Sequence, residues 1–206
     1  TEIDVVRQEA DALADLGVKV QVPSFMEEIV ATVSHLARSS PHINQRSGVS
    51  VRLSITNYET LIANAARRAL RLGESDAVPR VSDLEALASS TAGKVEIETL
   101  EEGRDSQVVE RLIKAAVLTV FKERCPIETL RDVITAVDEA TVIHTGDDIS
   151  AKQYVDTLSH IPALRDPVMA LAGSEGPGMV ASATEFLLEG LHLSKRLNKE
   201  AVGTRA

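Results

Sequence analysis

A run of apolar residues at helical spacing constrains the fold of this chain more than any other feature of its sequence. The members of the run lie mostly three or four positions apart: Val51, Ile55, Tyr58, Ile62, Ala65, Ala66 and Ala69. Side chains at this spacing share one face of an α-helix, so the run predicts a helix over about residues 50–72. Only 2% of the residues are aromatic and Trp is absent, so the core has to consist of Leu, Val, Ile and Ala. This composition favours packed helices, and we expect an all-α protein.

The start of this predicted helix has an unusual charge. Gly48 permits a sharp turn before the helix because it has no Cβ atom, and Ser47 or Ser50 can accept a hydrogen bond from a free N–H group of the first turn. Arg52 falls within that first turn, where a cation opposes the positive end of the helix dipole. Arg52 is either a solvated side chain that costs a few tenths of a kcal/mol, or a side chain that faces an anion, because helix N-termini attract phosphate groups.

Further helices are predicted on both sides of this one. Their approximate ranges are 2–16, 24–40, 82–90, 106–124, 127–138, 150–160 and 179–199. In three of them a capping box, in which a serine and a Glu or Gln three residues later each bind a free N–H group, marks the start: Ser24 with Glu27, Ser82 with Glu85, and Ser150 with Gln153. Residues 18–22 and 94–98 alternate in polarity and predict short extended segments, whereas prolines and glycines between positions 162 and 178 predict turns.

A loss of apolar periodicity at residues 99–105 marks the expected domain boundary. This segment contains Glu and Gly and has little to bury, whereas the stretches on either side keep a helical pattern. We therefore expect one helical unit over residues 1–100 and a second helical unit over residues 101–206.

Charge and composition exclude several classes of function. The net charge of −9 argues against a broad nucleic-acid-binding surface, although Arg67, Arg68 and Arg71 form a local basic patch in the sequence. The single cysteine, Cys125, can form no disulfide within the chain and fits a reducing compartment. There is no run of about 18 apolar residues and no signal peptide, so we expect a cytoplasmic protein that does not span a membrane. The first residue is Thr1 rather than Met, which favours a longer parent protein.

The segment around Arg52 resembles a known ATPase element. The run QRSGVSVRLSITNYETLIANAARRAL at positions 45–70, with the upstream segments 22–30 and 37–41, is similar to the sensor-2 region of AAA+ ATPases of the magnesium chelatase and MoxR group. In that family a loop of small residues leads into a lid helix, and an arginine near the start of the helix reads the terminal phosphate of the nucleotide. Arg52 is at the matching position.

The resemblance, which is best over residues 1–100, implies a fold and a function. The fold would be an AAA+ lid-type helical bundle followed by a second C-terminal helical bundle. The function would be that of the C-terminal part of a magnesium-chelatase-like ATPase, with Arg52 as its cofactor-binding residue. Such an ATPase uses ATP and Mg²⁺ in a homo-oligomeric ring to remodel a partner protein subunit or to insert a metal into a porphyrin.

The nucleotide-binding core of an ATPase is missing from this sequence. A P-loop needs Gly-x-x-x-x-Gly-Lys-Ser/Thr, but Gly93 and Lys94 are followed by Val95, and Ala88 is where the first glycine should be. No hydrophobic strand ends in the paired acids that hold Mg²⁺. We therefore expect the AAA+ core upstream of Thr1, and we expect this chain alone neither to bind ATP tightly nor to hydrolyse it. The alternative is a stand-alone helical protein-interaction module with Arg52 merely on its surface.

Other residue groups have the composition of functional sites, but for each a structural role is the preferred interpretation. His144, Asp147 and Asp148 could hold a metal or form a polar turn, and Glu185, Glu189 and His192 could form an acid–histidine face or a solvated face. The segment 173–178 could hold a phosphate or be a plain linker. The remaining candidates are Cys125, expected to be structural, and His35 and His42, expected to be solvated or capping residues.

Overall fold

The computed structural model describes residue 3 and residues 17–44, 49–92, 94–97, 105–139 and 142–200. Its α-helices are α2 (Ser24–Ser39), α3 (Arg52–Leu72), α4 (Leu87–Ala92), α5 (Asp105–Arg124), α6 (Arg131–Glu139), α7 (Ala151–His160), α8 (Arg165–Ala172) and α9 (Pro177–Leu193). Short 3₁₀ turns are η2 (Val81–Ala86), η3 (Ile127–Leu130) and η4 (Pro162–Leu164), and the strands are β1 (Lys19–Val20) and β2 (Asp76–Ala77). The expected all-α class is confirmed.

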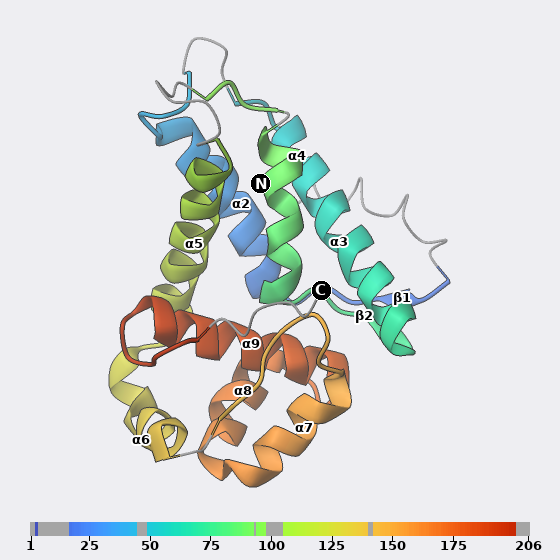
Figure 1. The fold of residues 1–206 in the computed structure, drawn as a ribbon, viewed down its shortest axis with the longest axis vertical. Helices are drawn as coiled ribbons and strands as arrows, with labels where there is room; N and C mark the ends of the chain where they lie inside the picture. Colours follow the sequence, from blue (N-terminus) through green and yellow to red (C-terminus); the bar gives the residue numbers. More distant parts are fainter. Residues whose placement is uncertain are drawn as a thin grey trace.

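The helices form an upper and a lower group (Figure 1). Helices α2, α3, α4 and α5 stand side by side above, α9 crosses beneath them, and α6, α7 and α8 lie below α9. The strands β1 and β2 pair in parallel beside the C-terminal end of α3, with Lys19 opposite Asp76 and Val20 opposite Ala77. Helix α9 therefore connects the two groups, because it packs on α5 above and on α7 and α8 below.

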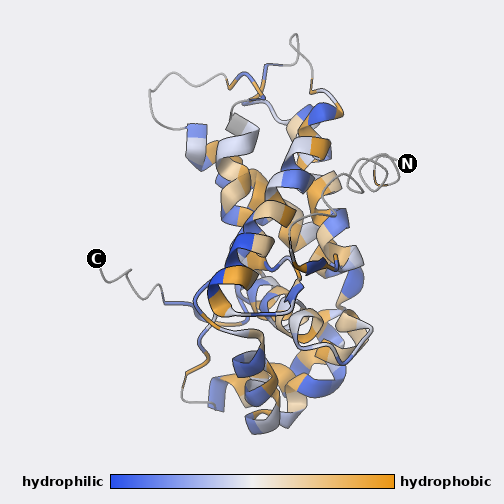
Figure 2. Cartoon of the chain, turned by 90° about the vertical axis from the view of Figure 1, so that its right-hand side faces the viewer, coloured by the Kyte–Doolittle hydropathy of each residue, from blue (hydrophilic) through white to orange (hydrophobic). Residues whose placement is uncertain are grey.

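One hydrophobic cluster extends through both groups. Phe186 of α9 stacks on Phe25 of α2 with ring centroids 4.5 Å apart, and Phe121 of α5 meets Phe186 edge-on at 6.0 Å. Figure 2 shows apolar stretches where the helices face one another. The cluster thus contains residues from both sides of the expected boundary at 99–105, a segment of which only Asp105 is described. The division into units 1–100 and 101–206 stays a prediction.

Most predicted helices are present, with shifted ends. The predicted helix at 2–16 lies outside the described residues apart from Ile3. The prolines and glycines predicted turns where the structure has helix α8. A proline in a helix interior breaks the helix, but Pro167 lies in the first turn of α8. N–H groups in a first turn have no partner within the helix, so proline is tolerated there. The last helix ends at Leu193 instead of 199, and Lys195 turns the chain with a positive φ of 58°.

The three predicted capping boxes have different outcomes. The one at Ser150 is confirmed, since Ser150 Oγ accepts a hydrogen bond from the Gln153 N–H group at 3.4 Å and Gln153 Oε1 accepts one from the Ser150 N–H group at 2.8 Å. The one at Ser24 is wrong because Pro23 is the N-cap, and Ser24 Oγ instead accepts a hydrogen bond from Arg124 at 3.0 Å. The one at Ser82 is also wrong, because the turn η2 begins earlier, at Val81, and Asp83 Oδ2 accepts a hydrogen bond from the N–H group of the N-cap residue Arg80 at 2.9 Å.

Candidate functional site

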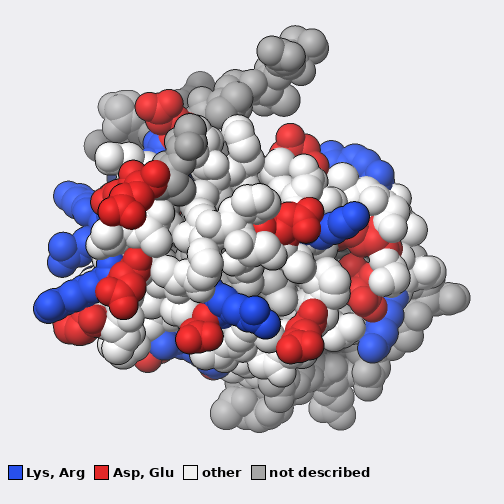
Figure 3. Space-filling view, turned by 90° about the horizontal axis from the view of Figure 1, so that it is seen from below, with Lys and Arg blue, Asp and Glu red and all other residues white. Residues whose placement is uncertain are grey.

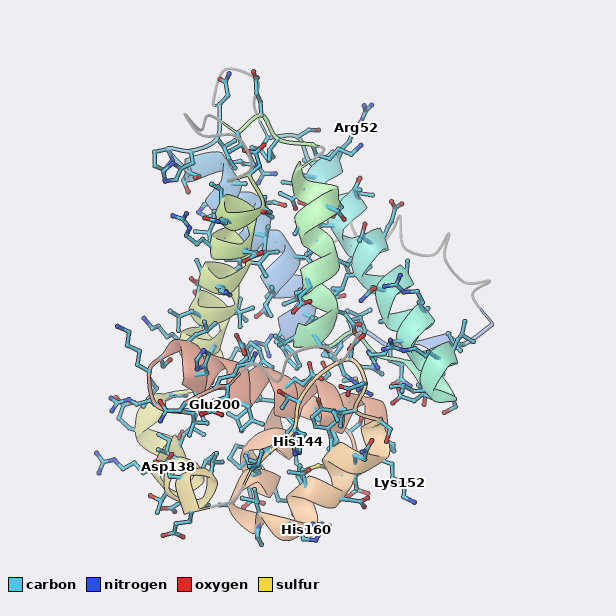
Figure 4. The ribbon with its side chains drawn as sticks, viewed as in Figure 1. Arg52, Asp138, His144, Lys152, His160 and Glu200 are labelled. Atoms are coloured by element: carbon cyan, nitrogen blue, oxygen red, sulfur yellow. The ribbon has the colours of Figure 1, made fainter. Side chains whose placement is uncertain are left out.

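Arg52 is the first residue of α3 and is exposed at the end of the molecule away from α7 and α8 (Figure 4). Ser50 Oγ accepts a hydrogen bond from the Arg52 N–H group at 3.3 Å, so this serine satisfies one free donor of the first turn as predicted. The first turn of α3 contains no acidic residue, and within the described ranges no carboxylate forms an ion pair with the Arg52 guanidinium. The predicted turn at Gly48 lies outside the described residues.

Buried polar contacts hold the N-terminal half of α3 in place. Ser54 Oγ donates to Ser34 Oγ of α2 at 2.6 Å. Asn57 is fully buried; its amide group donates to Thr91 Oγ1 of α4 at 3.0 Å, and its amide oxygen accepts from Ser90 Oγ at 2.7 Å. Because these bonds fix the helix between α2 and α4, the backbone at its N-terminus has a defined position.

The lead-in to α3 is also fastened. Arg38, in the last turn of α2, donates from Nε to the Val49 carbonyl oxygen at 3.3 Å. The arrangement therefore presents a solvent-exposed guanidinium on a fixed helix N-terminus. A guanidinium has donors in a planar fork that matches two oxygens of a phosphate or carboxylate, and the free N–H groups of a first helical turn favour the same anions.

The predicted basic patch at Arg67, Arg68 and Arg71 is wrong. Only Arg67 and Arg71 reach the surface, and Arg71 pairs there with Asp147 at 2.8 Å. Arg68 is 2% exposed because it points inward from α3. It lies in the apolar face of that helix, between Ala65 and Ala69, which is the one sequence signal that it is buried.

Arg68 belongs to a buried charged network that the sequence analysis missed. Its guanidinium donates to Asp83 Oδ2 at 2.9 Å and to Glu74 Oε2 at 3.1 Å, and Asp83 is fully buried. Burial lowers the pKa of Arg68, but the hydrogen bond to Asp83 and the charges of Asp83, Glu74 and Glu185 together outweigh burial, so the pKa is raised. Glu74 Oε1 also accepts from Arg80 at 2.8 Å and from the Ala151 N–H group at 2.6 Å, so it joins α3 to the start of α7.

Glu185 extends this network into α9. The predicted solvated face is wrong for this residue, which is 3% exposed and accepts hydrogen bonds from the Tyr154 hydroxyl at 2.7 Å and the Ser82 N–H group at 2.8 Å. Burial raises the pKa of Glu185, and burial together with the Glu185 charge raises the pKa of Tyr154. The Arg80 guanidinium lies 5.3 Å from the centre of the Tyr154 ring. Arg68, Arg80, Asp83 and Glu185 are buried, and the contacts of this network connect α3 with α7 and α9.

The other residues of α9 named in the sequence analysis lie nearer the surface. Glu189 pairs with Lys199 at 2.7 Å, and His192 Nδ1 lies 3.2 Å from the Leu197 carbonyl oxygen. Each residue therefore has a local partner, and the structure does not bring Glu185, Glu189 and His192 together around one ligand.

The remaining sequence candidates are separated or structural. Asp147 pairs with Arg71, and His144 lies on the loop before α7 (Figure 4). Within the described residues, no group of three or more His, Cys, Asp and Glu side chains is placed to hold a metal ion. Burial raises the pKa of the Cys125 thiol to about 11, so it stays protonated at neutral pH. His35 and His42 are exposed.

The glycine segment 173–178 forms the tight turn between α8 and α9. Gly173 ends α8 with a positive φ of 64°, and Gly176 precedes Pro177, the first residue of α9. A Cβ atom at Gly178 would lie 2.6 Å from Val78, so this glycine allows the close approach of α9 to the segment before η2. The linker interpretation fits this geometry.

Comparisons of the chain with models of protein families, with curated proteins and with solved structures found no match. None of the helices in the described ranges has both the length and the apolar character needed to cross a lipid bilayer. The function therefore has to be inferred from the residues themselves, and within the described part of the chain Arg52 is an exposed candidate at a helix N-terminus.

Proposed function

We propose that this chain is the C-terminal part of a magnesium-chelatase-like AAA+ ATPase, in which Arg52 reads the terminal phosphate of ATP. The observation that supports this proposal best is the position of Arg52, exposed at a fixed helix N-terminus without a carboxylate partner among the described residues. A cation at this position opposes the helix dipole, and a bound phosphate would turn that unfavourable contact into a favourable one.

The parent protein would supply the rest of the nucleotide site. Its AAA+ core would hold the β- and γ-phosphates with a P-loop and the Mg²⁺ ion with an acidic residue, neither of which this chain contains. Residues 1–100 would be the lid, and residues 101–206 would be a second helical bundle. The assembly would be a cytoplasmic homo-oligomeric ring that uses ATP to remodel a partner subunit or to insert a metal into a porphyrin.

A comparison of ATP and ADP binding tests this role of Arg52. In the parent protein, Arg52→Ala should weaken Mg·ATP binding at least tenfold, about 1.4 kcal/mol, and leave ADP binding unchanged, because only ATP has the terminal phosphate. Calorimetric titration measures both affinities. Arg67→Ala is the matched control, since Arg67 is exposed on the same helix, and it should leave both affinities unchanged.

The same titration separates the proposal from its alternative. If Arg52→Ala weakens ATP and ADP binding equally, Arg52 does not read the terminal phosphate. If the parent protein binds neither nucleotide, the interpretation as a stand-alone helical interaction module is the better one.

A further inference from the structure

A small hollow with two arginines lies between α6 and the segment that follows α9. Its volume is about 220 Å³, and its lining residues are Ile127, Glu128, Arg131, Ile134 and Arg196. Arg131 is the first residue of α6, whereas Arg196 follows the end of α9, so residues far apart in the sequence meet there. The hollow is distant from Arg52 in the fold, because α6 lies at the opposite end of the molecule (Figure 4).

The turn after α9 fixes the chain at Arg196. Lys195 has a positive φ of 58°, a conformation that L side chains rarely adopt. The Arg196 N–H group donates to the Leu191 carbonyl oxygen at 2.9 Å, and His192 Nδ1 lies 3.2 Å from the Leu197 carbonyl oxygen. These contacts fold the chain back over the end of α9 and bring Arg196 to the hollow.

The charges in the hollow are suited to an anion. Two guanidinium groups and one carboxylate give the lining a net charge of +1, although the whole chain has a net charge of −9. Figure 3 shows Lys and Arg side chains at the left edge of the lower face, the side on which Figure 1 has α6, with Asp and Glu side chains beside them. Both arginines are exposed, and neither forms an ion pair with another residue in the described ranges. Glu128 compensates only one of the two positive charges of this lining, so a bound anion would offset the second one.

We propose that this hollow binds the C-terminal residue of a partner polypeptide when that residue is aliphatic. Arg131 and Arg196 would bind the terminal carboxylate, and Ile127 and Ile134 would contact the aliphatic side chain. Glu128 would accept a hydrogen bond from the last amide N–H group of the peptide, a donor that a simple fatty acid lacks. Pockets for drug-sized ligands start at about 300 Å³, so this smaller hollow suits a single residue.

The test is an NMR titration of this chain with ¹³C-labelled isoleucine methyl groups. The probe is acetyl-Gly-Ala-Leu with a free carboxylate, and two further probes are the same peptide with a C-terminal amide and isovalerate. The free-acid peptide should shift the Ile127 and Ile134 methyl signals saturably with a dissociation constant of about 1 mM. The amide and isovalerate should each bind at least tenfold more weakly.

Variants connect the binding to the two arginines. Arg196→Ala and Arg131→Gln should each weaken peptide binding about tenfold, whereas Arg111→Ala, an exposed arginine on α5, should leave it unchanged. Circular dichroism checks that the variants stay folded. The proposal is overturned if the peptide causes no saturable shift up to about 10 mM. It is also overturned if the amide or isovalerate binds as tightly as the acid, or if Arg196→Ala binds normally.

Discussion

At the scale of single residues, Glu185 is the clearest conflict between burial and charge. Burial raises its pKa, and the hydrogen bonds from Tyr154 and Ser82 and the charge of Arg80 oppose that rise without cancelling it. The folded protein therefore binds the Glu185 proton more tightly than the unfolded chain does. As the pH rises above about 4.5, the ordinary pKa of this group, Glu185 lowers the unfolding free energy. This decrease stops once the pH has passed the raised pKa of the folded protein.

Glu185→Gln should remove this loss of stability. Urea unfolding of the wild type and of the variant between about pH 4 and pH 8 measures the difference in unfolding free energy at each pH. We expect that difference to move in favour of the variant as the pH rises, because glutamine has no proton to lose. A difference that is constant over the whole pH range would show that Glu185 does not titrate with a raised pKa.

A substitution at Asp83 tests, again at the scale of single residues, how much the buried charged network stabilises the fold. Asp83→Asn leaves the Arg68 guanidinium, which is 2% exposed, without its main counter-charge, and we expect a loss of about 3–5 kcal/mol in unfolding free energy. The matched control is Asp147→Asn, because Asp147 pairs with Arg71 on the surface and should lose about 1 kcal/mol or less. Urea unfolding measures both losses. Equal losses in the two variants would contradict the conclusion that the buried Arg68–Asp83 pair stabilises the fold more than a surface pair does.

At the scale of elements, the contact between α5 and α9 depends on Gly190. A Cβ atom at this position would lie 2.0 Å from Cδ2 of the Phe121 ring. Gly190→Ala should therefore destabilise the protein by about 1–3 kcal/mol through overpacking, although alanine favours helix formation by about 1 kcal/mol. Thermal unfolding measures the change. Gly176→Ala is the control, because its Cβ atom would meet only Ser174 at an ordinary 3.5 Å, and it should leave the melting temperature nearly unchanged.

The sequence predicts an element well where one face is apolar and the other is solvated. Helices α2, α3, α5 and α7 satisfy this condition, and the cap at Ser150 is purely local. Helix α9 does not, because it is packed between the upper and lower helices on several sides and buries Glu185 together with apolar residues. No local pattern distinguishes such an acid from a solvated one, so its burial could not be predicted.

The candidate sites also differ in how much of their position the sequence predicts. The location of Arg52 at the start of α3 follows from periodicity alone. The network of Arg68, Glu74 and Arg80 depends on how α3, η2 and α7 pack, and so does the hollow at Arg131 and Arg196. The hydrogen bond from the Ala151 N–H group to Glu74 and the hollow at Arg131 and Arg196 join residues that are distant in the sequence, and a single sequence contains no direct information about such pairs.

At the scale of the whole molecule, α3 extends from the exposed Arg52 at the upper end down to the level of β1 and β2 (Figure 1). Arg52 lies at the N-terminal end of this 21-residue helix. Near its C-terminal end, Arg68 pairs with Asp83 of η2, and Arg71 pairs with Asp147 in the loop before α7. Because Arg52 contacts solvent and the network is buried far along the helix, a substitution at Arg52 should leave folding intact. The unfolding free energy of Arg52→Ala should differ from that of the wild type by about 0.5 kcal/mol or less.

The ATPase rate of the parent protein with Arg52→Ala tests the central claim most directly. An arginine on the phosphoryl oxygens stabilises charge that develops during transfer, so we expect turnover to fall at least tenfold, about 1.4 kcal/mol. Arg52→Lys should restore it only in part, because lysine lacks the planar fork, and Arg67→Ala should keep the wild-type rate. An Arg52→Ala protein that folds normally and hydrolyses ATP at the wild-type rate would contradict the assignment of Arg52 as the phosphate-sensing residue.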